Sequence, residues 1–214
     1  MTTFTNQHSI LKTVTKVIRY LLFLFSFPFL TNCTKEKNIN SNDDFLKIDT
    51  TLIGVKIYDK NLGIKFNTPK NWLLTPTLAS KKEISLYGKG IKGQEKFIFT
   101  PTYVFFNTTT SGLLNVGMVV FEDSGRVSNA NFELYKSTLS QKLNPNLKAM
   151  VNFTKAGMNF TYFKGEQQNF VWITLVCSNL KGSVIQFNYN SVKQNYALEE
   201  NAIQSSIATI LPVK

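Results

Sequence analysis

The chain has 214 residues and a formal net charge of +11, with 24 basic residues, 13 acidic residues and two cysteines. Its one histidine, His8, precedes the segment interpreted below as a cleavage site. Because the chain after that site has no histidine, Ser-His catalysis, Cys-His catalysis and metal binding through an imidazole are excluded. The basic residues are scattered and accompany no RNA-binding motif, so we interpret them as a solvated surface and expect no nucleic-acid partner.

The N-terminal segment has the order of a bacterial lipoprotein signal. Basic residues precede an apolar run, Tyr20–Leu30, and small or polar residues follow it just before Cys33. We expect residues 1–32 to be removed as a signal peptide and the thiol of Cys33 to receive a diacylglycerol. Each buried methylene of the attached chains, including any palmitate, contributes about 0.8 kcal/mol to membrane attachment.

Two other interpretations of this segment stay open. A membrane-spanning helix needs roughly 20 apolar residues, whereas the apolar run has about half that length and includes Pro28. A plain secretory signal would end in an Ala-x-Ala-like site, which is not visible. Asn32 departs from the small residue that usually precedes the lipidated cysteine, yet the lipoprotein interpretation remains the favoured one.

Cleavage before Cys33 would leave 182 residues with a formal charge of +8, which suits one domain. Residues 33–44 are polar and predict a lipidated flexible tether, and residues 45–214 predict the folded domain. Thr34, rather than aspartate, follows the cysteine and favours the outer membrane. We therefore expect a lipid-anchored protein of the bacterial cell envelope, facing the periplasm or the outside.

The first half of the domain shows the period of β-strands. Alternating apolar residues around the break Asn61–Gly63 predict a β-hairpin, and Trp72, just after Pro69, is expected to anchor the core. The glycine-containing segment Gly88–Lys96 predicts a basic loop and matches no phosphate-binding motif. Further strands are expected at Ile84–Tyr87, Phe97–Thr100, Tyr103–Phe106 and Leu113–Phe121.

A helix is predicted next by Phe132, Tyr135, Leu139 and Leu143, which share one face, with Ser128 or Asn129 as its cap and Pro145 as its end. Four strands should follow, at Val151–Thr154, Met158–Lys164, Phe170–Cys177 and Ser183–Tyr189.

The strand Phe170–Cys177 is apolar on both faces, which predicts burial on both sides. Cys177 is then a small hydrophobic residue rather than a reactive thiol. A closing helix is predicted by Tyr196, Ile203, Ile207 and Ile210, with Glu199 and Glu200 near its N-terminal end.

Several of these features together resemble the PsbP-like α/β/α sandwich family. They are the turn Phe66-x-x-Pro69-x-x-Trp72 after the opening hairpin, the central helix, the late hairpin ending at Ile185–Tyr189, and the closing helix. The resemblance covers roughly Phe45–Lys214. It implies an α+β fold, a single α/β/α sandwich with a mainly antiparallel sheet covered by helices. It also implies a scaffold that works by binding other proteins, without a shared catalytic constellation, cofactor or metal.

We therefore expect a lipid-anchored envelope protein of binding or accessory type, without catalytic activity and with a protein partner. Candidate contact segments are Gly88–Lys96 and Thr108–Gly112. An enzyme is disfavoured because the acidic pair Glu122-Asp123 carries no signal for a shifted pKa. The alternative function is a carrier of an apolar ligand or lipid. Its pocket would be lined by Phe97, Phe99, Tyr103, Phe105, Phe106, Phe160, Tyr162 and Phe163.

Overall fold

The computed structural model describes residues 47–75, 84–90, 93–121 and 129–213. The chain divides into two compact units, Met1–Thr34 and Lys35–Lys214, and every described residue belongs to the second. The predicted signal, the lipidation site Cys33 and the tether lie outside the described residues, as does the pair Glu122-Asp123. Within the described part, no helix combines the length and the apolar character needed to cross a membrane.

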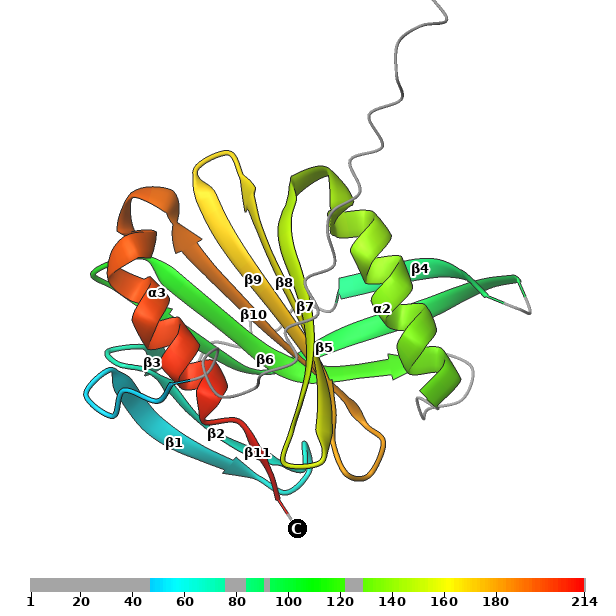
Figure 1. Cartoon of the computed structure of the whole chain (residues 1–214), viewed down its shortest axis with the longest axis horizontal. Coiled ribbons are helices and arrows are strands. Elements are labelled where there is room, and N and C mark those ends of the chain that lie inside the picture. Colours follow the sequence, from blue (N-terminus) through cyan, green and yellow to red (C-terminus); the bar gives the residue numbers. More distant parts are fainter. Residues whose placement is uncertain (1–46, 76–83, 91–92, 122–128, 214) are drawn as a thin grey trace, which may run out of the picture. The chain divides into compact units, whose positions relative to one another are not determined.

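The elements alternate between hairpins and two helices (Figure 1). In chain order they are β1 (Ile53–Asp59), β2 (Ile64–Pro69), β3 (Leu73–Leu74), β4 (Ile84–Gly90), β5 (Gly93–Asn107), β6 (Gly112–Phe121), α2 (Asn129–Leu143), the 3-10 turn η2 (Asn144–Asn146), β7 (Leu147–Lys155), β8 (Met158–Gln167), β9 (Phe170–Ser178), β10 (Val184–Val192), α3 (Lys193–Ala208) and β11 (Leu211–Pro212).

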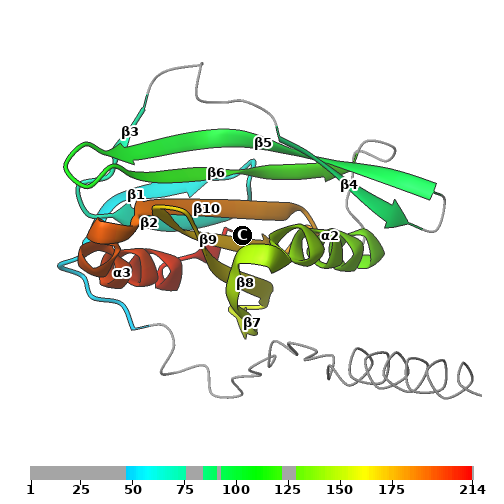
Figure 2. The ribbon, with the colours of Figure 1, turned by 90° about the horizontal axis from the view of Figure 1, so that it is seen from above.

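These strands form two sheets. The eight-stranded sheet has the order β3-β5-β6-β10-β9-β8-β7, with β4 also paired to β5, and the three-stranded sheet has the order β1-β2-β11. All of these pairings are antiparallel. Figure 2 shows the twist of the large sheet, in which β7 and β8 run across the direction of β5 and β6.

The large sheet separates two hydrophobic cores. Along β10, Phe187 and Tyr189 belong to the core beneath α3 and the small sheet, whereas Val184 belongs to the core beneath α2. Because successive side chains of a strand point to opposite faces, the two helices cover opposite faces of the same sheet. The α+β class and the helix-covered, antiparallel sandwich predicted from the sequence are therefore confirmed. The small sheet, an addition to the α3 layer, was not predicted.

Both helices bury the faces that their sequences predicted. Phe132, Tyr135 and Leu139 of α2 are buried, and the helix ends where η2 begins, at the turn that contains Pro145. In α3, Ile203 and Ile207 are buried. This helix begins at Lys193, so Glu199 and Glu200 lie beyond its first turn and do not stabilise its N-terminal end as predicted.

The segment Gly88–Lys96 is not a loop, contrary to the prediction. β4 and β5 continue as paired strands up to the facing residues Gly90 and Gly93, and only residues 91–92 between them are outside the description. Ladder hydrogen bonds join backbone groups, so glycines weaken such a hairpin without preventing it. The other proposed contact segment does contain a turn, which ends at Ser111 just before β6.

An irregularity in β5 separates aromatic residues that the sequence groups together. The register of β5 against β6 shifts between Pro101 and Tyr103. Such a bulge changes which face the following side chains occupy. As a result, Phe97 and Phe99 lie in the core beneath α2, whereas Phe105 lies in the core beneath α3.

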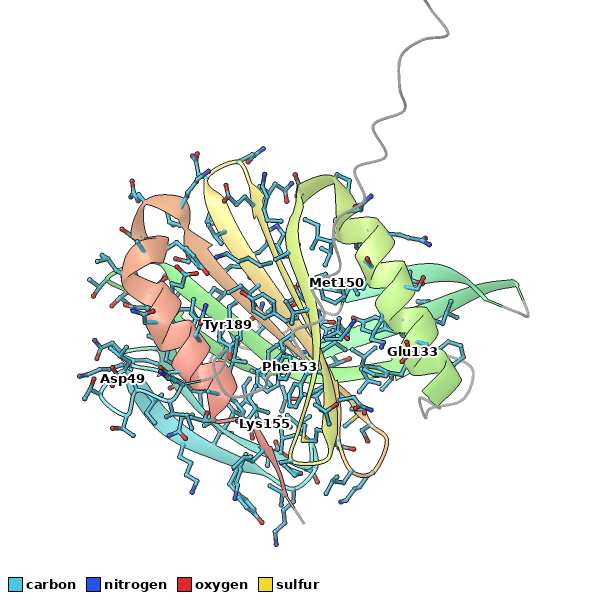
Figure 3. All side chains as sticks on the ribbon, viewed as in Figure 1. Asp49, Glu133, Met150, Phe153, Lys155 and Tyr189 are labelled. Carbon is cyan, nitrogen blue, oxygen red and sulfur yellow. The ribbon has the colours of Figure 1, made fainter. Side chains whose placement is uncertain are left out.

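Strand β7 contacts both helices. Near its start, the Ser140 hydroxyl of α2 donates to the Met150 sulfur at 3.9 Å. At its end, the Lys155 ammonium donates to the Ala208 carbonyl at the C-terminus of α3, and burial lowers the pKa of this lysine. Figure 3 shows Met150 and Lys155 on β7 with Phe153 between them. The ring of Phe153 stacks on that of Phe160.

Strand β9 is covered on both sides over only part of its length. Cys177 at its end is fully buried and has a raised pKa because of this burial, which confirms that it acts as a hydrophobic residue. At the other end, however, Phe170 is 47% exposed and Trp172 is half-buried. The prediction of complete burial is therefore wrong for the first residues of β9. Beside them, the sheet face borders a cavity.

Candidate functional site

A cavity of about 290 Å³ lies between α2 and the face of the large sheet that this helix covers. Leu139 of α2 and the strand residues Leu86, Phe97 and Phe99 form its apolar wall. Its polar lining includes five amide side chains, Asn115, Gln167, Gln186, Asn188 and Asn190. The volume lies near the lower end of the range for small-molecule sites.

The alternation of side chains along β10 places three of these amides on one face of the sheet, and together with Asn115 they form what we call the amide floor of the cavity. Gln186, Asn188 and Asn190 occupy every second position of the strand and alternate with Ile185, Phe187 and Tyr189, which are buried in the opposite core. The register places Asn188 between Asn115 of β6 and Thr174 of β9. Polar side chains therefore extend along one strand and across its two neighbours, at the spacing of adjacent residues on one sheet face.

A hydrogen-bond network holds part of this floor in place. The Tyr135 hydroxyl donates to Gln186 Oε1, and Gln186 Nε2 donates to Asn188 Oδ1 at 2.8 Å. The Thr174 hydroxyl donates to the same oxygen of Asn188 at 3.1 Å. Burial raises the pKa of Tyr135, so its hydroxyl keeps its proton and remains a donor at neutral pH. Asn188 Oδ1 thus accepts two hydrogen bonds from neighbouring side chains.

Asn115 contributes an acceptor with unused hydrogen-bonding capacity. Its side-chain oxygen is buried and has no hydrogen-bond partner among the described residues. An unsatisfied buried acceptor of this kind costs roughly 1–3 kcal/mol. Because Asn115 lines the cavity, a donor group of a bound molecule could satisfy this oxygen and recover that free energy.

Trp172 forms an aromatic side of the cavity and is positioned by a glycine. It faces Gly165 across the β8–β9 pair. A Cβ atom at Gly165 would lie 2.2 Å from Cζ2 of Trp172 and 2.3 Å from the Asn146 carbonyl oxygen. The absence of a side chain at Gly165 thus makes room for the indole ring close to the backbone of β8.

The cavity has little charge. Among the described residues that line it, Lys142, in the last turn of α2, is the one charged side chain, and none is a carboxylate. Neither a nucleophile with a partner base nor a pair of acids is present among the described lining residues, and the described chain contains no cluster of three or more metal-ligating side chains. This arrangement can bind and orient a neutral or anionic molecule through neutral hydrogen bonds.

The aromatic residues expected to line a carrier pocket are divided among different places. Phe97 and Phe99 line the cavity, whereas Phe105, Phe160 and Tyr162 are buried in the opposite core. Phe163 is buried beneath α2, Tyr103 is partly buried against the α3 core, and Phe106 is 37% exposed. The amide floor was not predicted from the sequence, although the polar residues that alternate with apolar residues in β10 indicate a polar face of that strand.

Comparison of the sequence with known family models and with curated proteins finds no match. Among solved structures, the solution structure of cyanobacterial PsbP from Synechocystis is similar to this chain. The TM-score is 0.45 and the sequence identity is 11%, and the match covers 74% of this chain and 91% of that chain.

Proposed function

We propose that the chain is a lipid-anchored binding protein of the bacterial cell envelope, without catalytic activity, whose cavity beneath α2 holds a small polar ligand. The cavity itself carries this proposal. It combines a fixed amide floor, a buried acceptor without a protein partner and an aromatic side. Binding sites use such groups to orient a ligand. Catalysis would require acid–base or nucleophilic groups in addition.

The same lining favours a polar ligand over the apolar one of the alternative hypothesis. An acyl chain placed against Asn115, Asn188 and Asn190 would cover amide groups without forming hydrogen bonds to them. Burying polar groups in this way costs free energy for each unpaired group. An apolar cargo would also gain contact with only Phe97 and Phe99 of the aromatic residues considered for that role.

Membrane anchoring through Cys33 is tested by labelling cells with radioactive palmitate. The wild-type protein and a Cys177→Ala variant should incorporate the label, whereas Cys33→Ala should not. Cys177→Ala is the matched control because it removes the other cysteine, which is buried in the folded domain. Absence of label from the wild-type protein, or its persistence in Cys33→Ala, would contradict the anchor. Separation of inner and outer membranes then tests the expected outer-membrane location.

The accessory role requires a protein partner near the anchor. Chemical cross-linking of intact envelopes, followed by purification of the tagged full-length protein, should recover the same partner in repeated preparations. Cys33→Ala should recover less of it if the anchor brings the two proteins together. Recovery of no protein above the background of an untagged strain would contradict the accessory role while leaving ligand binding by the cavity open to its own test.

A further inference from the structure

We infer that the cavity beneath α2 binds a pyranose sugar ring. This inference rests on the proposed binding function and names the class of ligand. Three properties of the site lead to it: the mixture of donors and acceptors on its floor, the aromatic side formed by Trp172, and the combination of small volume with a single positive charge.

The floor offers donors and acceptors close together, and none of its groups is ionised. Asn115 Oδ1 has no partner among the described residues and requires a donor, whereas the amide nitrogen of Asn188 is a donor group that a ligand acceptor can bind. These two residues face each other on neighbouring strands. Each hydroxyl group of a sugar donates one hydrogen bond and accepts others, so adjacent hydroxyls on one ring can satisfy both residues. A purely accepting ligand, such as sulfate, would leave Asn115 Oδ1 without a donor.

The aromatic side suits the apolar face of a sugar ring. Trp172 is half-buried, and it stands beside Asn190 in the β9–β10 register. A pyranose carries C–H groups on its ring faces and hydroxyls around its rim. The indole can cover the C–H groups while the neighbouring amides reach the rim. Gly165 is needed for this arrangement because any side chain there would displace the ring.

Volume and charge limit which sugars fit. A space of about 290 Å³ corresponds to roughly ten water molecules, which is close to the size of one hexose ring and too little for an extended chain. The described lining contains Lys142 and no carboxylate, so it offers a cationic amino sugar no counter-charge. We therefore expect neutral hexoses to bind and hexuronates to bind more tightly, with Lys142 facing the carboxylate.

A peptide is the principal competitor, since backbone amides also donate and accept hydrogen bonds. An extended peptide, however, requires a long groove or a free strand edge. The cavity instead lies beneath α2, and its polar floor is over β6 and β10 in the middle of the sheet. A closed ring matches this compact space better than a linear chain, and peptide binding is an outcome that the experiment separates.

The test uses the full-length protein purified in a detergent without a sugar headgroup. Ligand-observed NMR with glucose, N-acetylglucosamine, glucuronate and galacturonate should show saturation transfer, and a glycan array extends the panel to oligosaccharides. Asn115→Leu removes the unpaired oxygen and should retain or increase stability, because the unsatisfied acceptor is lost. It should nonetheless weaken sugar binding about tenfold or more, as expected from the loss of an oriented hydrogen bond.

Asn159→Leu is the matched control, because Asn159 is exposed on β8 and lies outside the cavity lining. Its sugar binding should equal that of the wild-type protein. Lys142→Ala should weaken hexuronate binding and leave neutral hexoses unaffected. Loss of binding in Asn159→Leu as well, or equal binding by Asn115→Leu, would overturn the sugar site.

Failure of the inference and failure of the proposed function give different results. If no sugar binds but native mass spectrometry of the protein from its own membranes reveals another polar molecule, or a peptide library binds, the cavity is a binding site and the sugar assignment is wrong. If neither sugars, peptides nor any co-purifying molecule is found, the proposed ligand-binding function is wrong too.

Discussion

Asp59 accepts three hydrogen bonds, two within the first hairpin and one from the large sheet. Its Oδ1 accepts from the backbone N–H groups of Asn61 and Leu62 at 2.7 and 2.9 Å, which fixes the turn between β1 and β2. Its Oδ2 accepts from the Tyr103 hydroxyl of β5 at 2.8 Å. One side chain thus fixes a local turn and connects two sheets.

Replacing Tyr103 with phenylalanine removes only the contact between the sheets. We expect Tyr103→Phe to lower the free energy of unfolding by about 1 kcal/mol at neutral pH, as for one hydrogen bond to a carboxylate that is partly solvated. Burial, followed by the hydrogen bond to Asp59, raises the pKa of Tyr103 from 10.0 to about 12. Because the folded-state pKa is the higher one, this stabilisation is complete below pH 10.0 and is lost as the pH rises toward about 12.

Urea denaturation of both proteins across this pH range measures the effect. The difference between wild type and Tyr103→Phe should shrink above pH 10.0. Other buried tyrosines destabilise both proteins equally there and cancel in the difference. Tyr58→Phe, which alters an exposed side chain, should match the wild type throughout. A difference that is constant with pH would show that Tyr103 does not titrate as described.

The burial of individual core residues could be predicted where their hydrophobicity and size alone determine it. Trp72 follows a proline turn and is large and apolar, and it is 1% exposed as expected. Glu199 shows the limit of such reasoning. Its sequence context indicated a charge near a helix end, whereas its side chain is 3% exposed because partners from distant segments surround it. Periodicity within a helix cannot reveal such partners.

At the scale of elements, Glu199 joins α3 to the turn between β5 and β6. Its carboxylate accepts hydrogen bonds from the hydroxyls of Thr110 in this turn and Ser191 at the end of β10. The turn comes close because Gly112 has no side chain: a Cβ atom there would lie 2.5 Å from Glu199 Oε1 and 2.5 Å from Cζ2 of Trp72. The helix, the turn and the core tryptophan are therefore packed as one unit.

Removing this carboxylate should destabilise the fold more than an ordinary helix substitution. We expect Glu199→Ala to lower the free energy of unfolding by about 2–4 kcal/mol, since it leaves the buried hydroxyl of Ser191 and the half-buried hydroxyl of Thr110 without their acceptor and opens a small cavity. Leu198→Ala is the control, because this neighbouring side chain is 77% exposed and should change stability by less than about 0.5 kcal/mol. Equal effects of the two substitutions in chemical denaturation would refute the connection.

The order of the elements was largely predictable because hairpins and amphipathic helices leave short-range patterns. The helix predicted at Phe132–Leu143 lies within α2, and the one predicted from Tyr196 to Ile210 corresponds to α3, which ends two residues earlier, at Ala208. The hairpin at Gly88–Lys96 was not predicted because glycine and lysine have a weak intrinsic preference for strands. The pairing of β4 with β5 has a larger effect than this weak preference.

At the scale of the whole described domain, the same strands supply both cores. β6 contributes Val116 to the core beneath α3 and Val119 to the core beneath α2. β10 does the same with Phe187 and Val184. The small sheet and the cavity were not predictable at this scale, since β11 consists of the two residues Leu211–Pro212 and the cavity depends on the register of three strands.

Shared strands imply that the two faces unfold together. Trp72 lies in the core beneath α3, and Trp172 packs against the core beneath α2, so each single-tryptophan variant reports on one face. Fluorescence of Trp72→Phe and of Trp172→Phe should each give one transition that coincides with the far-ultraviolet circular dichroism of the same protein. Adding Leu139→Ala, which empties part of the α2 core, should lower the free energy of unfolding by about 2–4 kcal/mol in both variants.

The control on α2 is Glu133→Ala, which removes an exposed carboxylate and its 2.7 Å ion pair with Lys136 (Figure 3). An exposed pair of this kind contributes little, so the transitions should move by less than about 0.5 kcal/mol. If Leu139→Ala shifted the signal of Trp172 and left that of Trp72 unchanged, the α2 face would be a separate folding unit. We expect the two signals to shift together because both cores are built on the same strands, β6, β9 and β10. Packing on one face can then be lost only together with the pairing of strands that the other face needs.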